Sequence, residues 1–229
     1  MINSNDLTYK PLYYAYDDGG KEYIVTYGNS VTIANEFVAH WICEKLNLPT
    51  AKTHLVSENG IIPSDYALAI ECLEGLRRIK VPTMSQNLQD ELIGHLTVGY
   101  LLGSLDTMRF YTDNEHIYTF GYNKAFHFPH ICDQNSNETK TIIKDNMKSY
   151  KQFLQTIDFD ISTIANEWGI PELYFKEKMK YFAQRISGIS SIDTNEMKKQ
   201  LANLYSINLP QMYIKCISNL KAHISIFDT

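Results

Sequence analysis

The chain has 229 residues, and its 21 Lys and Arg residues against 26 Asp and Glu residues give a formal net charge of −5. An apolar fraction of 44% and a charged fraction of 21% are ordinary for a globular protein and exclude disorder along the whole chain. The acidic balance differs from the basic face of a protein that binds duplex nucleic acid. We therefore expect no nucleic-acid partner.

The cysteines and the N-terminus point to a reducing compartment. The four cysteines are far apart in the sequence, at Cys43, Cys72, Cys132 and Cys216, so no pair has the close spacing of a zinc knuckle. The N-terminal residues lack the basic and apolar parts of a signal peptide. No window approaches the about 18 uninterrupted apolar residues that a transmembrane helix needs. We expect a cytoplasmic protein with reduced thiols and no membrane segment.

The first part of the chain is predicted to contain strands. Two stretches rich in aromatic and β-branched residues, 12–16 and 22–27, flank the sequence Asp-Asp-Gly-Gly at positions 17–20. A turn of this composition between two such stretches is typical of a β-hairpin. We therefore predict an antiparallel pair of strands at 13–16 and 23–27.

A helix and two further strands are predicted next. Apolar side chains, among them Phe37 and Trp41, recur at helical spacing over 34–46, and the following proline ends that helix. Strands are predicted at 54–56 and 66–70. The resulting order, β-β-α-β-β, predicts a small antiparallel sheet with the helix packed on it through Phe37 and Trp41.

The rest of the chain is mainly helical in its pattern. Leucines and a glycine spaced three and four residues apart predict a helix over 88–102. Residues 103–131 are predicted to be irregular, apart from short strands at 117–120 and 126–129. Further helices are predicted over 147–156, 160–168, 171–187 and 194–224, the last with a break near Pro210.

Four stretches carry a resemblance to a known family. They are residues 10–25, 34–49, 101–106 and 167–171, and in that order they resemble the HipA-like and phosphatidylinositol-kinase-like family of the protein-kinase-like fold. The resemblance covers roughly residues 8–187. It implies an α+β fold of two lobes: a small antiparallel β lobe with one helix over 1–80, and a mainly helical lobe over 81–229, which together form one kinase-like domain.

Phosphoryl transfer in this fold needs five side chains. A strand lysine holds the phosphates and pairs with a helix glutamate, an aspartate accepts the hydroxyl proton, and an asparagine and a second aspartate hold the metal ions. The resemblance places Glu36 at the helix glutamate and Asp106 at the catalytic aspartate. It places Thr26 at the lysine, Tyr111 at the asparagine and Gly121 at the second aspartate, so three of the five side chains are replaced.

These replacements predict a degenerate kinase, or pseudokinase, that acts as a protein-binding or regulatory module. Its nucleotide cleft would be lined by Thr26, Glu36 and Gly121, with or without residual nucleotide binding, and no cofactor is firmly implied. A protein partner is expected.

Two alternatives stay open. The first is an active ATP-dependent serine/threonine kinase, with Asp106 as the base and Asp113 and Asn114 on Mg²⁺. The second is a toxin–antitoxin or phage–host interaction or inhibitor protein that reuses the fold.

Two further groups of side chains, one of metal-competent residues and one of basic residues, are interpreted without a functional role. His127, His130, Cys132 and Asp133 are the only tight group of metal-competent side chains in the sequence, and we interpret them as loop residues packed with nearby phenylalanines. The basic run at 77–80 is interpreted as a solvated linker near the junction of the lobes, where it would otherwise meet phosphate or an acidic partner.

Overall fold

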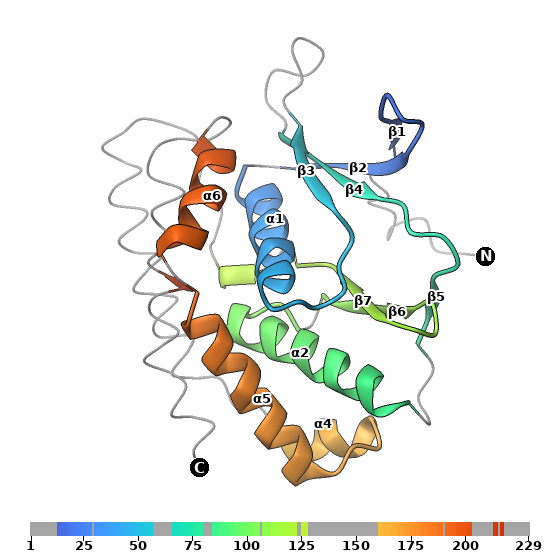
Figure 1. The fold of residues 1–229 in the computed structure, drawn as a ribbon, viewed down its shortest axis with the longest axis vertical. Coiled ribbons are helices and arrows are strands. Elements are labelled where there is room, and N and C mark those ends of the chain that lie inside the picture. Colours follow the sequence, from blue (N-terminus) through green and yellow to red (C-terminus); the bar gives the residue numbers. More distant parts are fainter. Residues whose placement is uncertain are drawn as a thin grey trace, which may run out of the picture.

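The computed structural model describes residues 13–28, 30–56, 66–79, 84–105, 107–122, 125–127, 160–189, 191–202, 213–214 and 216–217. These residues form two small antiparallel sheets together with helices, which is an α+β fold (Figure 1). No helix in the described ranges is long and apolar enough to cross a membrane.

The first sheet has four strands and contains the predicted hairpin. Its strands are β1 (Tyr13–Tyr16), β2 (Glu22–Gly28), β3 (Thr53–Val56) and β4 (Tyr66–Glu71), in the spatial order β1-β2-β4-β3. The Asp17 carboxylate accepts hydrogen bonds from the backbone N–H groups of Gly19 and Lys21, each at 2.9 Å. Gly20 adopts φ +80°, a conformation that glycine reaches without strain. These contacts explain why the turn forms where the sequence predicts it.

Helix α1 (Ser30–Lys45) follows β2 and covers one face of this sheet (Figure 1). Leu68 and Ile70 of β4 share one buried cluster with Phe37 and Trp41 of α1. The alternate residues of the strands form a separate small cluster on the other face, made of Tyr23, Val25, Ala67 and Ala69. The period of two along each strand produces this separation. The predicted β-β-α-β-β order is confirmed.

The second sheet was predicted only in part. It has the order β5 (Arg77–Arg78), β6 (Arg109–Thr112), β7 (Ile117–Phe120), and β7 has the predicted bounds. The basic run is therefore not only a linker, because the backbone of β5 pairs with β6 while both arginine side chains are exposed. β6 lies in a segment that was predicted to be irregular, since four residues without clear alternation carry little strand signal.

The next three helices lie beneath α1 and the second sheet in the view of Figure 1. Helix α2 (Gln86–Leu102) is capped at its start by Ser85, whose hydroxyl accepts from the Leu88 N–H, and at its end by Gly103, which has φ +75°. Helices α4 (Ile161–Glu167) and α5 (Glu172–Ser187) follow, and α5 lies along α2 (Figure 1). Lys178 of α5 contacts Asp90 of α2 at 2.7 Å.

Two predictions in the second half of the chain need correction. Residues 126–129 were predicted as a strand, but Ala125–His127 form a 3₁₀ helix, η1, in which Phe126 has φ +63°. The Phe126 ring is fully buried against Tyr213, with 4.9 Å between ring centroids, and this packing overrides strand propensity. Helix α6 (Ser191–Ala202) begins before the predicted residue 194. The predicted helix at 147–156 and the break near Pro210 lie outside the described residues.

Candidate functional site

Glu36 and Gly121, two of the predicted cleft residues, are in direct contact. Glu36 lies on α1, and its Oε1 accepts a hydrogen bond from the Gly121 N–H at 3.1 Å. The same oxygen lies 3.4 Å from Nε2 of His40, one helical turn later. Glu36 is buried, with 7% of its surface exposed. The carboxylate therefore joins α1 to the segment that follows β7.

Both backbone polar groups of Gly121, the N–H and the carbonyl oxygen, are hydrogen-bonded. Its carbonyl oxygen accepts from Thr107 Oγ1 at 2.6 Å and from Ser104 Oγ at 3.3 Å, and its backbone has φ +95°. A Cβ atom at this position would clash with the carbonyl oxygen of Thr107. The place where the resemblance expects a metal-binding aspartate is thus built around a glycine, because neither the conformation nor the space suits a side chain.

Thr26 lies on the face of the first sheet that packs on α1. It is paired with Leu68 of β4, which belongs to the same core as the helix, and its Oγ1 donates to the Leu68 carbonyl oxygen at 3.4 Å. The nearby Lys21 binds Glu71 at 2.5 Å instead of Glu36. No lysine pairs with Glu36 among the described residues.

The other candidate site residues lie apart from this contact or outside the described residues. Asp113 and Asn114 form the turn between β6 and β7, at the opposite end of that hairpin from Gly121. The Asp113 carboxylate accepts from the N–H groups of Glu115 and His116 at 2.9 and 2.8 Å, and Asn114 binds Arg77. The Asp113 side chain therefore holds the turn, and the Asn114 side chain joins the turn to β5.

Two predicted features lie outside the described ranges. They are Asp106 and the residues from Phe128 through Asp133. Within those ranges, no group of three or more His, Cys, Asp or Glu side chains is arranged to hold a metal ion.

A buried polar cluster behind the Glu36–Gly121 contact was not predicted. Tyr122 Oη lies 3.4 Å from Cys43 Sγ and 3.3 Å from His95 Nδ1, and His95 Nε2 lies 3.0 Å from the Ile117 carbonyl oxygen. Burial lowers the pKa of His95 to about 4 and raises the pKa of Cys43 to about 12. Both side chains are neutral near pH 7, so the cluster is a set of hydrogen bonds in the core and Cys43 is not an activated nucleophile.

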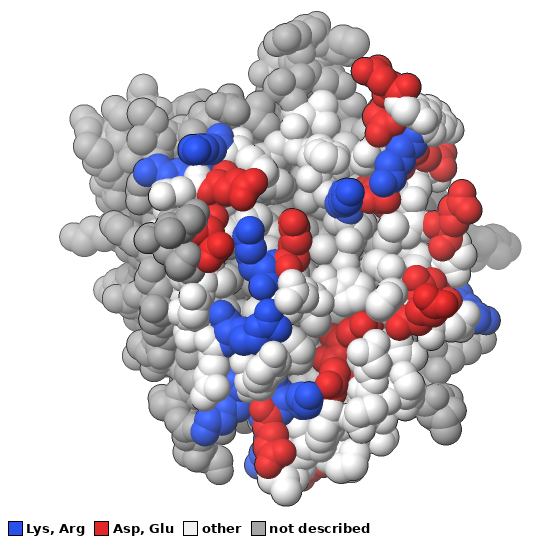
Figure 2. Space-filling view, viewed as in Figure 1, with Lys and Arg blue, Asp and Glu red and all other residues white. Residues whose placement is uncertain are grey.

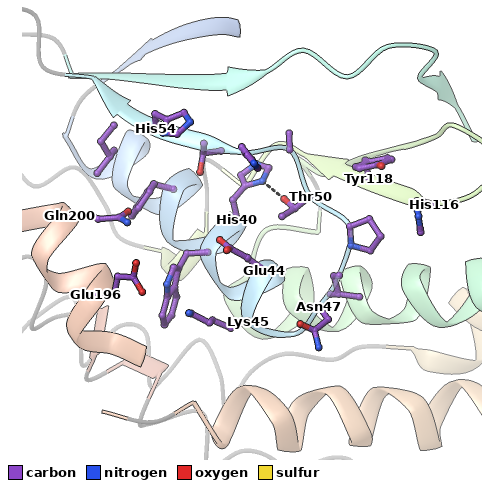
Figure 3. A pocket seen from close by; sticks show the side chains of 18 residues that line it. His40, Glu44, Lys45, Asn47, Thr50, His54, His116, Tyr118, Glu196 and Gln200 are labelled. Atoms are coloured by element: carbon purple, nitrogen blue, oxygen red, sulfur yellow. Dashed lines mark hydrogen bonds between the residues drawn. The ribbon is translucent and has the colours of Figure 1, made fainter. Parts of the chain in front are cut away.

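A groove of about 950 Å³ opens beside α1. Figure 3 shows side chains from α1, the segment 47–52, β3, β7 and α6 around it. His40 lies at its inner wall, with Nδ1 at 2.6 Å from Thr50 Oγ1. Thr26, Glu36 and Gly121 do not line this groove. Its side chains are distributed over residues that are distant in the sequence, so no motif predicted it.

Comparison with known proteins adds no assignment. No family model matches the chain, and no curated protein matches it.

Proposed function

We propose that the chain is a degenerate member of the HipA-like, kinase-like group that binds a protein partner and does not transfer phosphate. The observation that carries the proposal is the closed environment of Gly121. Its N–H is bound by Glu36, its carbonyl oxygen by Thr107 and Ser104, and there is no room for a Cβ atom. A kinase needs a carboxylate at this position to hold Mg²⁺.

The environment of Thr26 and Glu36 supports the same proposal. In a kinase the helix glutamate orients a lysine that binds the phosphates. Here the glutamate is used by a backbone N–H, the strand position carries a short neutral hydroxyl, and Lys21 is paired with Glu71. The donor set offered by Thr26, Glu36 and Gly121 does not fit a Mg²⁺–ATP complex.

We expect no incorporation of phosphate when the purified chain is incubated with radiolabelled ATP and Mg²⁺, either into itself or into generic protein substrates. Loss of one electrostatic group typically lowers a rate by about 10²–10³, and three such groups are replaced. The Asp106→Ala variant is the control. Incorporation that disappears in this variant would show a working site and would favour the active-kinase alternative.

Nucleotide binding distinguishes the pseudokinase from the interaction-protein alternative. In that alternative, a toxin–antitoxin or phage–host inhibitor reuses the fold. Thermal unfolding with ATP, with and without Mg²⁺ or Mn²⁺, separates the hypotheses, because a ligand that binds only the folded state raises the melting temperature. A rise without metal is expected for a pseudokinase that retains nucleotide binding. A metal-dependent rise favours the active kinase, and no rise favours the interaction protein.

A further inference from the structure

Among the residues that the structure describes, strand β3 is an edge of the first sheet. Within them it pairs with β4 alone, at the end of the order β1-β2-β4-β3. The Glu71 N–H donates to the Lys52 carbonyl oxygen at 2.9 Å, so the pair of residues 52 and 71 is hydrogen-bonded. Antiparallel pairs alternate between bonded and non-bonded. Thr53 and Leu55 therefore direct their backbone N–H and C=O groups away from β4.

These outward groups have no hydrogen-bond partner among the described residues. No hydrogen bond to the backbone of Thr53 or Leu55 from outside the β3–β4 pairing is found in the described part of the chain. The two residues lie about 6.6 Å apart along the strand, which is the repeat of an extended backbone. An edge of this kind is a template for another strand.

The groove described above lies directly beside this edge. Thr53, His54 and Leu55 line it, and its inner wall includes the buried side chains of Phe37 and Trp41. An apolar side chain that enters the groove from a bound strand would contact this wall.

Charged groups around the groove are also available for binding. The side chains of Glu44, Lys52 and Glu196 make no hydrogen bond or ion pair with other described residues. Figure 2 shows that acidic and basic side chains interleave on this face and that neither sign forms a single patch. The surface therefore complements a segment that carries charges of both signs better than a strongly acidic or strongly basic one.

We propose that the β3 edge and this groove bind an extended segment of a protein partner, which adds to the sheet as a strand through the backbone groups of Thr53 and Leu55. The segment places an apolar side chain against the Phe37–Trp41 wall and carries acidic and basic residues that meet Lys52 and Glu196. This inference rests on the proposed function, since it gives the protein-binding module its binding surface. Backbone pairing supplies affinity and the groove supplies specificity.

The test is selection of a random twelve-residue peptide library, displayed on phage, against the full chain. An enriched peptide is then synthesised, and its affinity is measured by fluorescence polarisation. We expect Leu55→Pro to weaken binding by about tenfold or more, because it removes an outward N–H and opposes strand addition. Leu55→Pro leaves the ladder to β4 intact, since the Leu55 N–H does not take part in it.

The opposite edge of the same sheet offers a matched control. The Asp17 N–H donates to the Lys21 carbonyl oxygen at 3.0 Å, so the same alternation directs the Tyr14 N–H away from β2. Tyr14→Pro therefore also removes an outward N–H, this time from β1, and it should leave peptide affinity within about twofold. Glu196→Lys, on α6, should change the affinity without touching the strand.

Amide hydrogen exchange of the unmodified chain provides a measurement that does not depend on the folding of a variant. Saturation with the peptide should slow the exchange of the Thr53 and Leu55 amides and leave the Tyr14 amide unchanged. Absence of any enriched peptide, protection at β1 instead of β3, or a dimer in light scattering that Leu55→Pro disrupts would each overturn the proposal. Phosphate transfer that depends on Asp106 would instead contradict the proposed function while leaving peptide binding as measured.

Discussion

Gly121→Ala is expected to lower the free energy of unfolding by roughly 2–5 kcal/mol. The left-handed conformation costs an alanine about 1–2 kcal/mol, and insertion of a methyl group into packed surroundings adds about 1–3 kcal/mol. The added Cβ atom meets the Thr107 carbonyl oxygen, which is backbone and cannot move aside as a flexible side chain would. Urea denaturation, with the midpoint and slope compared with those of the unmodified protein, measures the change.

Gly20→Ala separates the two causes. Gly20 also has a left-handed backbone, with φ +80°, but a Cβ atom there meets nothing within 4 Å. We expect this variant to lose only about 1–2 kcal/mol, the cost of the conformation alone. Equal losses at positions 20 and 121 would show that the space around Gly121 is not restrictive. That result would remove the main support for the proposal that position 121 has no room for a metal-binding side chain.

The same geometry bears on how a kinase-like site could be lost. The N–H and the carbonyl oxygen of Gly121 are bound by Glu36, Thr107 and Ser104. An aspartate at this position would have to disrupt these backbone hydrogen bonds before its carboxylate could reach a metal ion. In the proposed pseudokinase, the missing metal position would therefore be a property of the surrounding packing as well as of one residue. A single substitution to aspartate is not expected to create Mg²⁺ binding.

Signals within a single stretch of sequence predicted the helices and strands that depend on contacts within that stretch. The β1–β2 hairpin follows from its Asp-Gly turn, and α1 and α2 follow from their apolar spacing. By contrast, β5 has only two residues and exists because β6 pairs with it. Such pairing depends on contacts between distant segments, which no pattern in a single stretch reports.

The candidate site divides in the same way. Glu36 and Gly121 were identified by resemblance, and the structure adds that they touch. The Cys43–His95–Tyr122 cluster and the groove at β3 were not predicted, because their members come from separate elements and are brought together only by folding. A partial signal was present on α2, where the polar residues Glu91 and His95 lie one helical turn apart in a largely apolar helix.

Glu91→Ala is expected to lower the free energy of unfolding by roughly 2–4 kcal/mol, because it leaves a buried backbone donor without a partner. The Glu91 carboxylate accepts from the Ile117 N–H at 2.7 Å, lies 3.0 Å from His116 Nδ1 and accepts from Asn87 at 3.0 Å. It thereby fixes the β6–β7 hairpin on α2. Glu91→Gln, which keeps an oxygen acceptor for Ile117, should lose about half as much. A change below about 0.5 kcal/mol in the alanine variant would contradict this role.

The Glu91–His116 pair also gives the stability a dependence on pH. The hydrogen bond to Glu91, together with its negative charge, raises the pKa of His116. The stabilisation is therefore fully present below the ordinary histidine value of about 6.5 and is lost as pH rises through the higher value of the folded state. Since 45% of the His116 side chain is exposed, solvent screening should keep the effect below about 1 kcal/mol. Denaturation at about pH 6 and about pH 8 should show this loss in the unmodified protein and a smaller one in Glu91→Gln. An equal pH dependence in both proteins would show that the Glu91–His116 pair does not cause it.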